Sequence, residues 1–235
     1  MGAVAEVYER TRKRPDLFWN TYVCRPLAAV FVAGVKDTAV TPNQITLGAF
    51  VVAAVAAALL IALPGYLGLV LAIVVYELSY VLDCADGMLA RWRNQQSTPG
   101  HLLDFLMDEI KAFMILAAAS VRLWREHQSE VFLLIGLGGL VCLSTGIAIT
   151  TFQRRPEIAP PALPADAPAP SPPSVVKRAV GLVERVAKFL IHYPSYILYV
   201  ALTGRLEWFL YPYVAVNAVY AAKSLLSVAL RFGRR

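Results

Sequence analysis

The chain has 235 residues, of which 58% are hydrophobic and 16% charged, and its mean hydropathy is +0.57. A soluble domain of this length needs much less apolar surface, so the composition predicts an integral membrane protein. The net charge of +6 fits basic cytoplasmic loops that face anionic lipid, and we expect no nucleic-acid partner.

Residues 1–40 form the first predicted unit, an amphipathic segment at the cytoplasmic interface. From Val7 to Val35, basic residues such as Arg25 alternate with aromatic residues such as Trp19 and Tyr22. This pattern suits a helix in the headgroup layer, and an ordinary surface helix packed on the bundle is the alternative. The first residues lack the apolar core of a signal peptide, so we expect them to be retained on the cytoplasmic side.

Residues 41–235 form the second predicted unit, an all-α membrane domain of about six transmembrane helices. Thr41 and Pro42 supply a helix start, since Thr can cap a helix and Pro is tolerated in its first turn. A proline- and alanine-rich linker at 156–174 separates the fourth and fifth spans. The predicted spans are Ile45–Leu63, Tyr66–Leu82, Leu102–Val121, Val131–Phe152, Val180–Leu202 and Leu206–Val228.

The distribution of basic residues predicts the orientation of the chain. With the N-terminus inside, the opposite loops hold only Arg122, Arg125 and Arg205, and the other basic residues considered lie on the cytoplasmic side. We therefore expect both termini in the cytoplasm. The stretch from Asp83 to Asp108 then also lies at the cytoplasmic face.

That stretch contains four aspartates between two apolar runs. Asp83 and Asp86 are three residues apart, and Asp104 and Asp108 are four apart, so each pair projects from one face of a helix. If the two helices are antiparallel neighbours, joined by a turn at 95–99, the pairs converge. Their mutual repulsion predicts a divalent cation, Mg²⁺ or Mn²⁺, and four carboxylates suffice for two ions.

Nearby residues favour phosphoryl chemistry. Arg91 follows Asp83 by two helical turns, where its planar guanidinium can hold a phosphate. Gly87 and Gly100 lack side chains, and Ala90 has a short one, so a flat group such as a nucleobase can approach the backbone. Metal ions on a pyrophosphate would stabilise the leaving phosphate, while one carboxylate accepts a proton from an attacking hydroxyl.

Eight fixed residues over 26 positions resemble the signature of the class I CDP-alcohol phosphotransferases, which are integral membrane enzymes. The matching residues are Asp83, Asp86, Gly87, Ala90, Arg91, Gly100, Asp104 and Asp108. Thr41-Pro42-Asn43 with Thr46, ahead of the first span, also resembles a stretch common in that family.

The resemblance implies transfer of a substituted phosphate from a CDP-linked donor, which we expect to be CDP-diacylglycerol, to the hydroxyl of a polar alcohol. CMP is released, and the reaction belongs to phospholipid biosynthesis. By family likeness, the metal ligands are Asp83, Asp86, Asp104 and Asp108, and Asp108 is also the general base. The donor-binding residues would be Asn43, Thr46, Gly87, Ala90, Arg91 and Gly100. The resemblance also implies a homodimer, and we expect the plasma membrane of a prokaryote.

The acceptor must be read from residues outside the motif. A basic pocket formed by Arg154, Arg155, Arg185 and Lys188 would suit a phosphorylated alcohol such as inositol phosphate or glycerol phosphate. The alternative is that these residues contact lipid phosphates. The run Glu109-Ile110-Lys111-Ala112 departs from better-known branches of the family, which weakens any assignment of one particular acceptor.

Two other classes of function compete with the enzyme. A membrane cation transporter or channel could use the same aspartates as an ion path. That hypothesis must explain why the acids gather at one membrane face beside Arg91 and two glycines. A catalytically silent scaffold would have no need of the intact set of aspartates.

Overall fold

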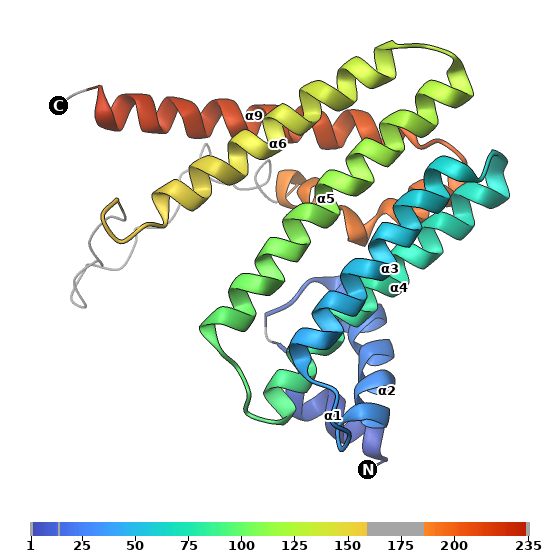
Figure 1. Ribbon diagram of the computed structural model, residues 1–235, viewed down its shortest axis with the longest axis vertical. Coiled ribbons are helices and arrows are strands. Elements are labelled where there is room, and N and C mark those ends of the chain that lie inside the picture. The colour runs from blue at the N-terminus through green and yellow to red at the C-terminus, as the bar shows by residue number, and fades with distance from the viewer. Residues whose placement is uncertain (1, 14, 159–185, 234–235) are drawn as a thin grey trace, which may run out of the picture.

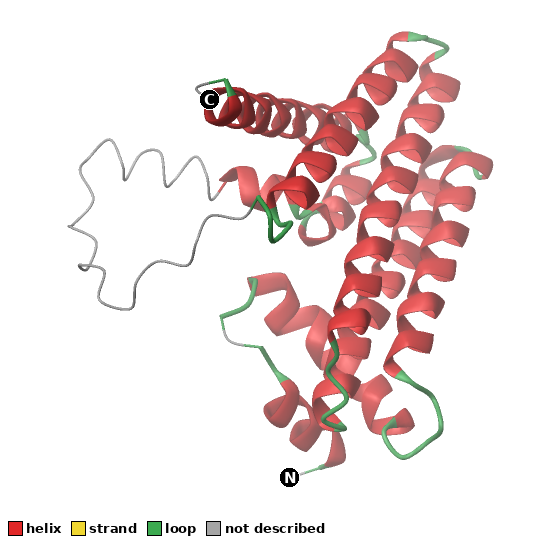
Figure 2. Cartoon of the chain, turned by 60° about the vertical axis from the view of Figure 1, so that its left-hand side comes forward, coloured by secondary structure: helices red, strands yellow, loops and turns green. Residues whose placement is uncertain are grey.

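The computed structural model describes residues 2–13, 15–158 and 186–233, and these contain helices and no strand (Figures 1 and 2). The all-α prediction is therefore confirmed. The α-helices with their bounds are α1 (Ala3–Thr11), α2 (Arg25–Val35), α3 (Pro42–Ala62), α4 (Gly65–Trp92), α5 (Thr98–His127), α6 (Val131–Gln153), α8 (Ile197–Thr203) and α9 (Glu207–Phe232). A π-helical turn covers Asn20–Cys24, and a 3₁₀ turn covers Tyr193–Ser195.

Four of these helices, α3, α4, α6 and α9, are long and apolar enough to cross a membrane. They correspond to the first, second, fourth and sixth predicted spans. The third predicted span lies within α5, whose 30 residues are long enough to cross but carry more charge than the other four. The total of six spans therefore remains a prediction.

The fifth predicted span, Val180–Leu202, is not one continuous helix where the structure describes it. Helical structure stops at His192, a 3₁₀ turn follows, and α8 has only 7 residues. Pro194 lies within this break and has no N–H for an α-helical hydrogen bond. The first residues of the predicted span, and the linker from 159 onward, lie outside the described residues.

The start of α3 agrees with the sequence-based prediction. The Thr41 side chain accepts a hydrogen bond from the Gln44 N–H, the Gln44 side chain accepts one from the Thr41 N–H, and Pro42 occupies the first helical turn. This reciprocal capping fixes the residue at which α3 begins. It also fixes Asn43 and Thr46 on the first turn of the helix.

The N-terminal segment is a broken helix and not the single amphipathic helix predicted over Val7–Val35. Helix α1 ends at Thr11, and Pro15 lies at a bend before the π-helical turn. Because proline supplies no N–H, it cannot continue an α-helix from the preceding turn. The break allows Trp19 to donate a hydrogen bond from Nε1 to Glu77 Oε2 on α4, at 3.2 Å.

Helices α3, α4 and α5 run side by side, and α1 and α2 lie against the end of α4 that carries the aspartates (Figure 1). Helices α6 and α9 pack against each other on the other side of α5. Alanines such as Ala53, Ala56 and Ala72 are fully buried in the shared core, where small side chains let membrane helices approach closely.

Helices α4 and α5 run in opposite directions and both pack on α3, and this arrangement positions the acidic stretch (Figure 1). Helix α4 continues past the second predicted span to Trp92, and α5 begins at Thr98 after a short connection (Figure 1). The Ser97 hydroxyl caps α5 by accepting a hydrogen bond from the Gly100 N–H at 3.1 Å. The aspartates therefore lie on regular helix at the end of α4 and the beginning of α5.

Candidate active site

Three aspartates from two helices converge. Asp83 on α4 and Asp104 and Asp108 on α5 each present a carboxylate oxygen, and these oxygens lie within 4.8 Å of one another. The spacing along each helix predicts this meeting. Such a group of hard oxygen donors suits Mg²⁺ or Mn²⁺, so the residues fit the divalent ion expected from the sequence.

Asp86 lies one helical turn after Asp83 and is almost fully buried, with 6% of its surface exposed. Its Oδ2 accepts a hydrogen bond from the Thr46 hydroxyl of α3 at 2.5 Å. A carboxylate held in this way has a fixed direction, because Thr46 is itself on the capped first turn of α3. Asp86 is thereby oriented from a third helix.

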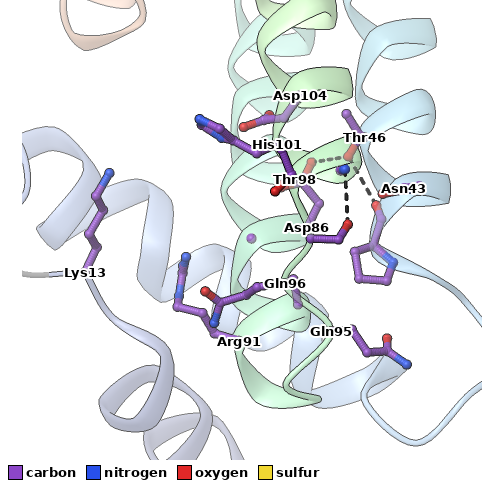
Figure 3. A pocket seen from close by; sticks show the side chains of 15 residues that line it. Lys13, Asn43, Thr46, Asp86, Arg91, Gln95, Gln96, Thr98, His101 and Asp104 are labelled. Atoms are coloured by element: carbon purple, nitrogen blue, oxygen red, sulfur yellow. Dashed lines mark hydrogen bonds between the residues drawn. The ribbon is translucent and has the colours of Figure 1, made fainter. Parts of the chain in front are cut away.

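A first cavity of about 560 Å³ lies beside Asp86 and Asp104 (Figure 3). All six residues expected to bind the CDP-linked donor line it: Asn43, Thr46, Gly87, Ala90, Arg91 and Gly100. They come from α3, α4 and the start of α5. The structure therefore gathers the whole predicted set around one space that opens beside two of the aspartates.

The two glycines of the motif allow close contacts inside this wall. A Cβ atom on Gly87 would lie 3.3 Å from Arg91 Nη1, and one on Gly100 would lie 3.2 Å from Asn43 Oδ1. Both contacts are tighter than a side chain normally tolerates. Arg91 Nε also donates to the Thr11 carbonyl oxygen at 2.6 Å, so the N-terminal segment fixes the guanidinium at the cavity.

A second cavity of about 590 Å³ lies beside Asp108, whose side chain is 51% exposed. Its wall includes Lys111 of α5, Arg154 after α6 and Lys188. Of the four predicted acceptor residues, Arg154 and Lys188 line this cavity. Arg155 does not line it, and Arg185 lies outside the described residues.

The carboxylates therefore stand between two cavities. Asp86 and Asp104 line the first cavity, and Asp108 lines the second. Asp104 and Asp108 belong to the same group of converging carboxylates. A group bound in one cavity can thus meet a group bound in the other at these aspartates.

A chain of polar contacts ties the N-terminal segment to the second cavity. The Tyr80 hydroxyl donates to Asn20 Oδ1 at 2.8 Å and lies 2.9 Å from His192 Nε2. Asn20 in turn donates to Asp16 at 3.2 Å, and Asp16 pairs with Arg25. Both Tyr80 and His192 line the second cavity, so this chain of contacts fixes part of its wall.

The pKa of Asp16 reflects this environment. Burial raises the pKa of the carboxyl, but the hydrogen bond from Arg25, the Leu17 N–H and the charge of Arg25 outweigh burial. The net result is a pKa below the ordinary value of 3.8. Asp16 therefore stays ionised, and its side chain is only 8% exposed.

Several residues of both cavities were not predicted. Lys13, Gln96, Thr98 and His101 also line the first cavity, and Tyr76, Tyr80, Lys111 and His192 line the second. Lys13 reaches the first cavity from the N-terminal segment (Figure 3). Only Lys111 carried a usable signal, because it follows Asp108 by three residues and therefore shares its helix face.

Comparison with known proteins supports the same assignment. No curated protein matches the chain. The family model described as CDP-alcohol phosphatidyltransferase matches residues 39–172, which is more than half of the chain and includes every aspartate of the site. This integral membrane protein therefore belongs to the CDP-alcohol phosphatidyltransferase family, whose divalent-metal-dependent transferases move a phosphatidyl group from a CDP-alcohol to an acceptor alcohol.

Proposed function

We propose that this enzyme transfers a substituted phosphate from CDP-diacylglycerol to the hydroxyl of a polar alcohol and releases CMP. The observation that carries the proposal is the position of the carboxylates between two cavities. A transferase of this kind must hold a donor and an acceptor at once, on opposite sides of the reacting phosphorus.

The first cavity is the proposed donor site. Arg91 would hold the diphosphate, and Gly87, Ala90, Gly100, Asn43 and Thr46 would surround the cytidine part. Asp83, Asp86, Asp104 and Asp108 would hold one or two divalent ions, Mg²⁺ or Mn²⁺. When bound there, such an ion polarises the phosphorus and stabilises the charge that develops on CMP.

Asp108 is the proposed general base. Its exposed carboxylate faces the second cavity, where an acceptor hydroxyl would bind. The proton moves from the hydroxyl to Asp108, the hydroxyl oxygen forms a bond to the lipid-linked phosphorus, and the bond from that phosphorus to the CMP oxygen breaks.

The second cavity supports a phosphorylated alcohol, such as inositol phosphate or glycerol phosphate, as acceptor. Arg154 and Lys188 line it and can bind a phosphate, and tyrosine hydroxyls can bind the alcohol groups. An acceptor screen tests this idea with matched variants. Arg154→Ala should raise KM for the phosphorylated acceptor several-fold, whereas Arg155→Ala, at a residue outside the cavity, should leave it unchanged. Equal use of inositol and inositol phosphate by the wild type would exclude a phosphate pocket.

CMP release by the purified protein tests the function as a whole. With CDP-diacylglycerol, Mg²⁺ and an acceptor, CMP should form, and EDTA should stop it. The competing hypothesis, a cation transporter or channel, predicts ion flux into proteoliposomes without any CMP. Flux that depends on the aspartates, together with no CMP from any CDP-linked donor, would overturn the proposal.

We further propose the setting in which the enzyme works. The bias of basic residues supports a chain with both termini and the active site on the cytoplasmic side of a prokaryotic plasma membrane. Family likeness supports a homodimer. Cysteine labelling of intact cells and of inverted vesicles tests the first point, and mass measurement in detergent tests the second.

A further inference from the structure

Lys111 is a buried ammonium in the middle of the carboxylate group. It follows Asp108 by one turn of α5, and its side chain is only 4% exposed. Its Nζ lies 2.7 Å from Asp108 Oδ1 and also contacts Asp83 Oδ1 on α4. The lysine therefore bridges two of the three carboxylates that converge.

A buried lysine is costly unless it is paired. Here each partner is a carboxylate that would otherwise repel its neighbours, since Asp83, Asp86, Asp104 and Asp108 lie on adjoining helix turns. The ammonium offsets part of that negative charge. The ammonium therefore supplies positive charge that a bound cation would otherwise have to supply.

We propose that Lys111 is a built-in counter-ion, which holds Asp83 and Asp108 together in the metal-free protein and competes with the divalent ion for their oxygens. The inference rests on the proposed function only for the identity of the metal ligands. It adds that the chain carries its own substitute for the ion. The metal-free fold is then stable, and the affinity for the ion is lower than the aspartates alone would give.

The structure leaves room for a divalent ion to displace Lys111 from the carboxylates. Lys111 lines the second cavity, so its flexible four-carbon stem can withdraw from the carboxylates into that space. An ammonium and a divalent cation repel each other at contact distance. Even with the dielectric constant of water, that repulsion weakens metal binding by about tenfold or more. Removing the positive charge should therefore tighten binding.

Lys111→Met tests the inference in the full-length protein, because it keeps the length of the side chain and removes its charge. Mn²⁺ binding is followed by the electron paramagnetic resonance signal of the free ion, and thermal unfolding is measured in EDTA. Lys111→Met should bind Mn²⁺ about tenfold more tightly than the wild type. It should also melt at a lower temperature in EDTA and recover when Mn²⁺ is added.

Two further variants keep the result interpretable. Lys111→Arg retains the charge and should bind Mn²⁺ with nearly wild-type affinity. Lys223→Met removes a lysine of α9 that lines neither cavity, and it should leave the affinity for Mn²⁺ unchanged. Unchanged or weaker Mn²⁺ binding by Lys111→Met would overturn the inference, because a lysine that only orients the carboxylates predicts that outcome.

The experiment also covers a variant that does not fold. If Lys111→Met stays unfolded with saturating Mn²⁺, the inference is wrong, because a counter-ion can be replaced by another cation. The binding assay does not depend on turnover. Tighter Mn²⁺ binding without CMP release would therefore overturn the proposed function and leave the role of Lys111 intact.

Discussion

The two cavities on either side of the carboxylates are built in different ways. Most of the wall of the first cavity comes from two short stretches, 42–46 and 86–104, on helices that follow one another along the chain. The wall of the second cavity combines residues from the N-terminal segment, α4, α5, α6, the break around His192 and α9. Local sequence therefore determines the first cavity, and packing between distant segments determines the second.

This difference has a functional meaning in the proposed mechanism. The donor side needs the same chemistry whatever the acceptor is, and a compact motif on adjoining helices provides it. The acceptor side can change its shape through substitutions in any of several segments without disturbing the aspartates. We therefore expect substitutions in the first cavity to affect turnover with every acceptor, and those in the second to affect the choice of acceptor or its affinity.

Among the variants that compare the two cavities, the largest effect is expected for Asp86→Asn. The variant keeps the size of the side chain but loses the charge that faces the first cavity, so CMP release should fall about 10³-fold with any acceptor. Asp37→Asn is the matched control, because Asp37 lies before α3 with 82% of its side chain exposed. Turnover is measured as CMP formed at saturating donor. A loss of turnover with one acceptor only would contradict the assignment of Asp86 to the donor cavity.

Asp16→Asn should have the next largest effect, on stability. Breaking the buried pair with Arg25 leaves an uncompensated charge, which typically costs about 3 kcal/mol or more. Denaturant unfolding in detergent measures the change. Glu9→Gln, which removes an exposed partner of Arg12, should cost much less. Because Asp16 connects through Asn20 to Tyr80, KM for the acceptor should also rise. An unchanged KM for the acceptor would mean that this chain of contacts does not support the second cavity.

Arg91→Lys should act on the donor side and more weakly. Lysine cannot reproduce the planar guanidinium that contacts the Thr11 carbonyl and faces the first cavity. We expect KM for the CDP-linked donor to rise about tenfold. Initial rates at varied donor and varied acceptor check this result. An equal rise in both KM values would mean that the substitution disturbs the structure of both cavities and not the donor cavity alone.

The smallest expected effect is the pH dependence that Asp16 confers. Its pKa is below 3.8 in the folded protein, so its contribution to stability is fully present above that value and is lost as the pH falls through the folded pKa. Acidification from pH 5 to pH 3 should therefore destabilise the wild type more than Asp16→Asn. Melting temperatures at the two pH values give the comparison. An equal drop in melting temperature for the two proteins would show that the stability from the pair with Arg25 does not depend on the charge of Asp16.

Sequence alone predicts the helix geometry around the first cavity well. The capping of α3 by Thr41, the turn between α4 and α5 and the meeting of Asp83 with Asp104 and Asp108 all follow from short-range rules of helix spacing and helix ends. These rules operate within a few residues or between consecutive helices. The donor-binding set was named mainly by family likeness, and Lys13, Gln96, Thr98 and His101, which also line the first cavity, were not predicted.

The second cavity follows from contacts that no short-range rule contains. The contact of Lys111 with Asp83 depends on the register between α4 and α5, and the contact of Tyr80 with His192 joins residues 112 positions apart. The break at Pro15 and the break near His192 also turned two expected helices into shorter pieces. Leu17, after the first break, and His192 and Pro194, at the second, line the second cavity.

The most direct measurement compares CMP release by the wild type and by Asp108→Asn, with donor binding measured in the same preparations. If Asp108 receives the proton between the two cavities, the variant should still bind the CDP-linked donor, and its turnover should fall by about 10²- to 10⁴-fold. Full turnover by Asp108→Asn, with the wild-type dependence on acceptor concentration, would contradict the proposed meeting of donor and acceptor at this carboxylate.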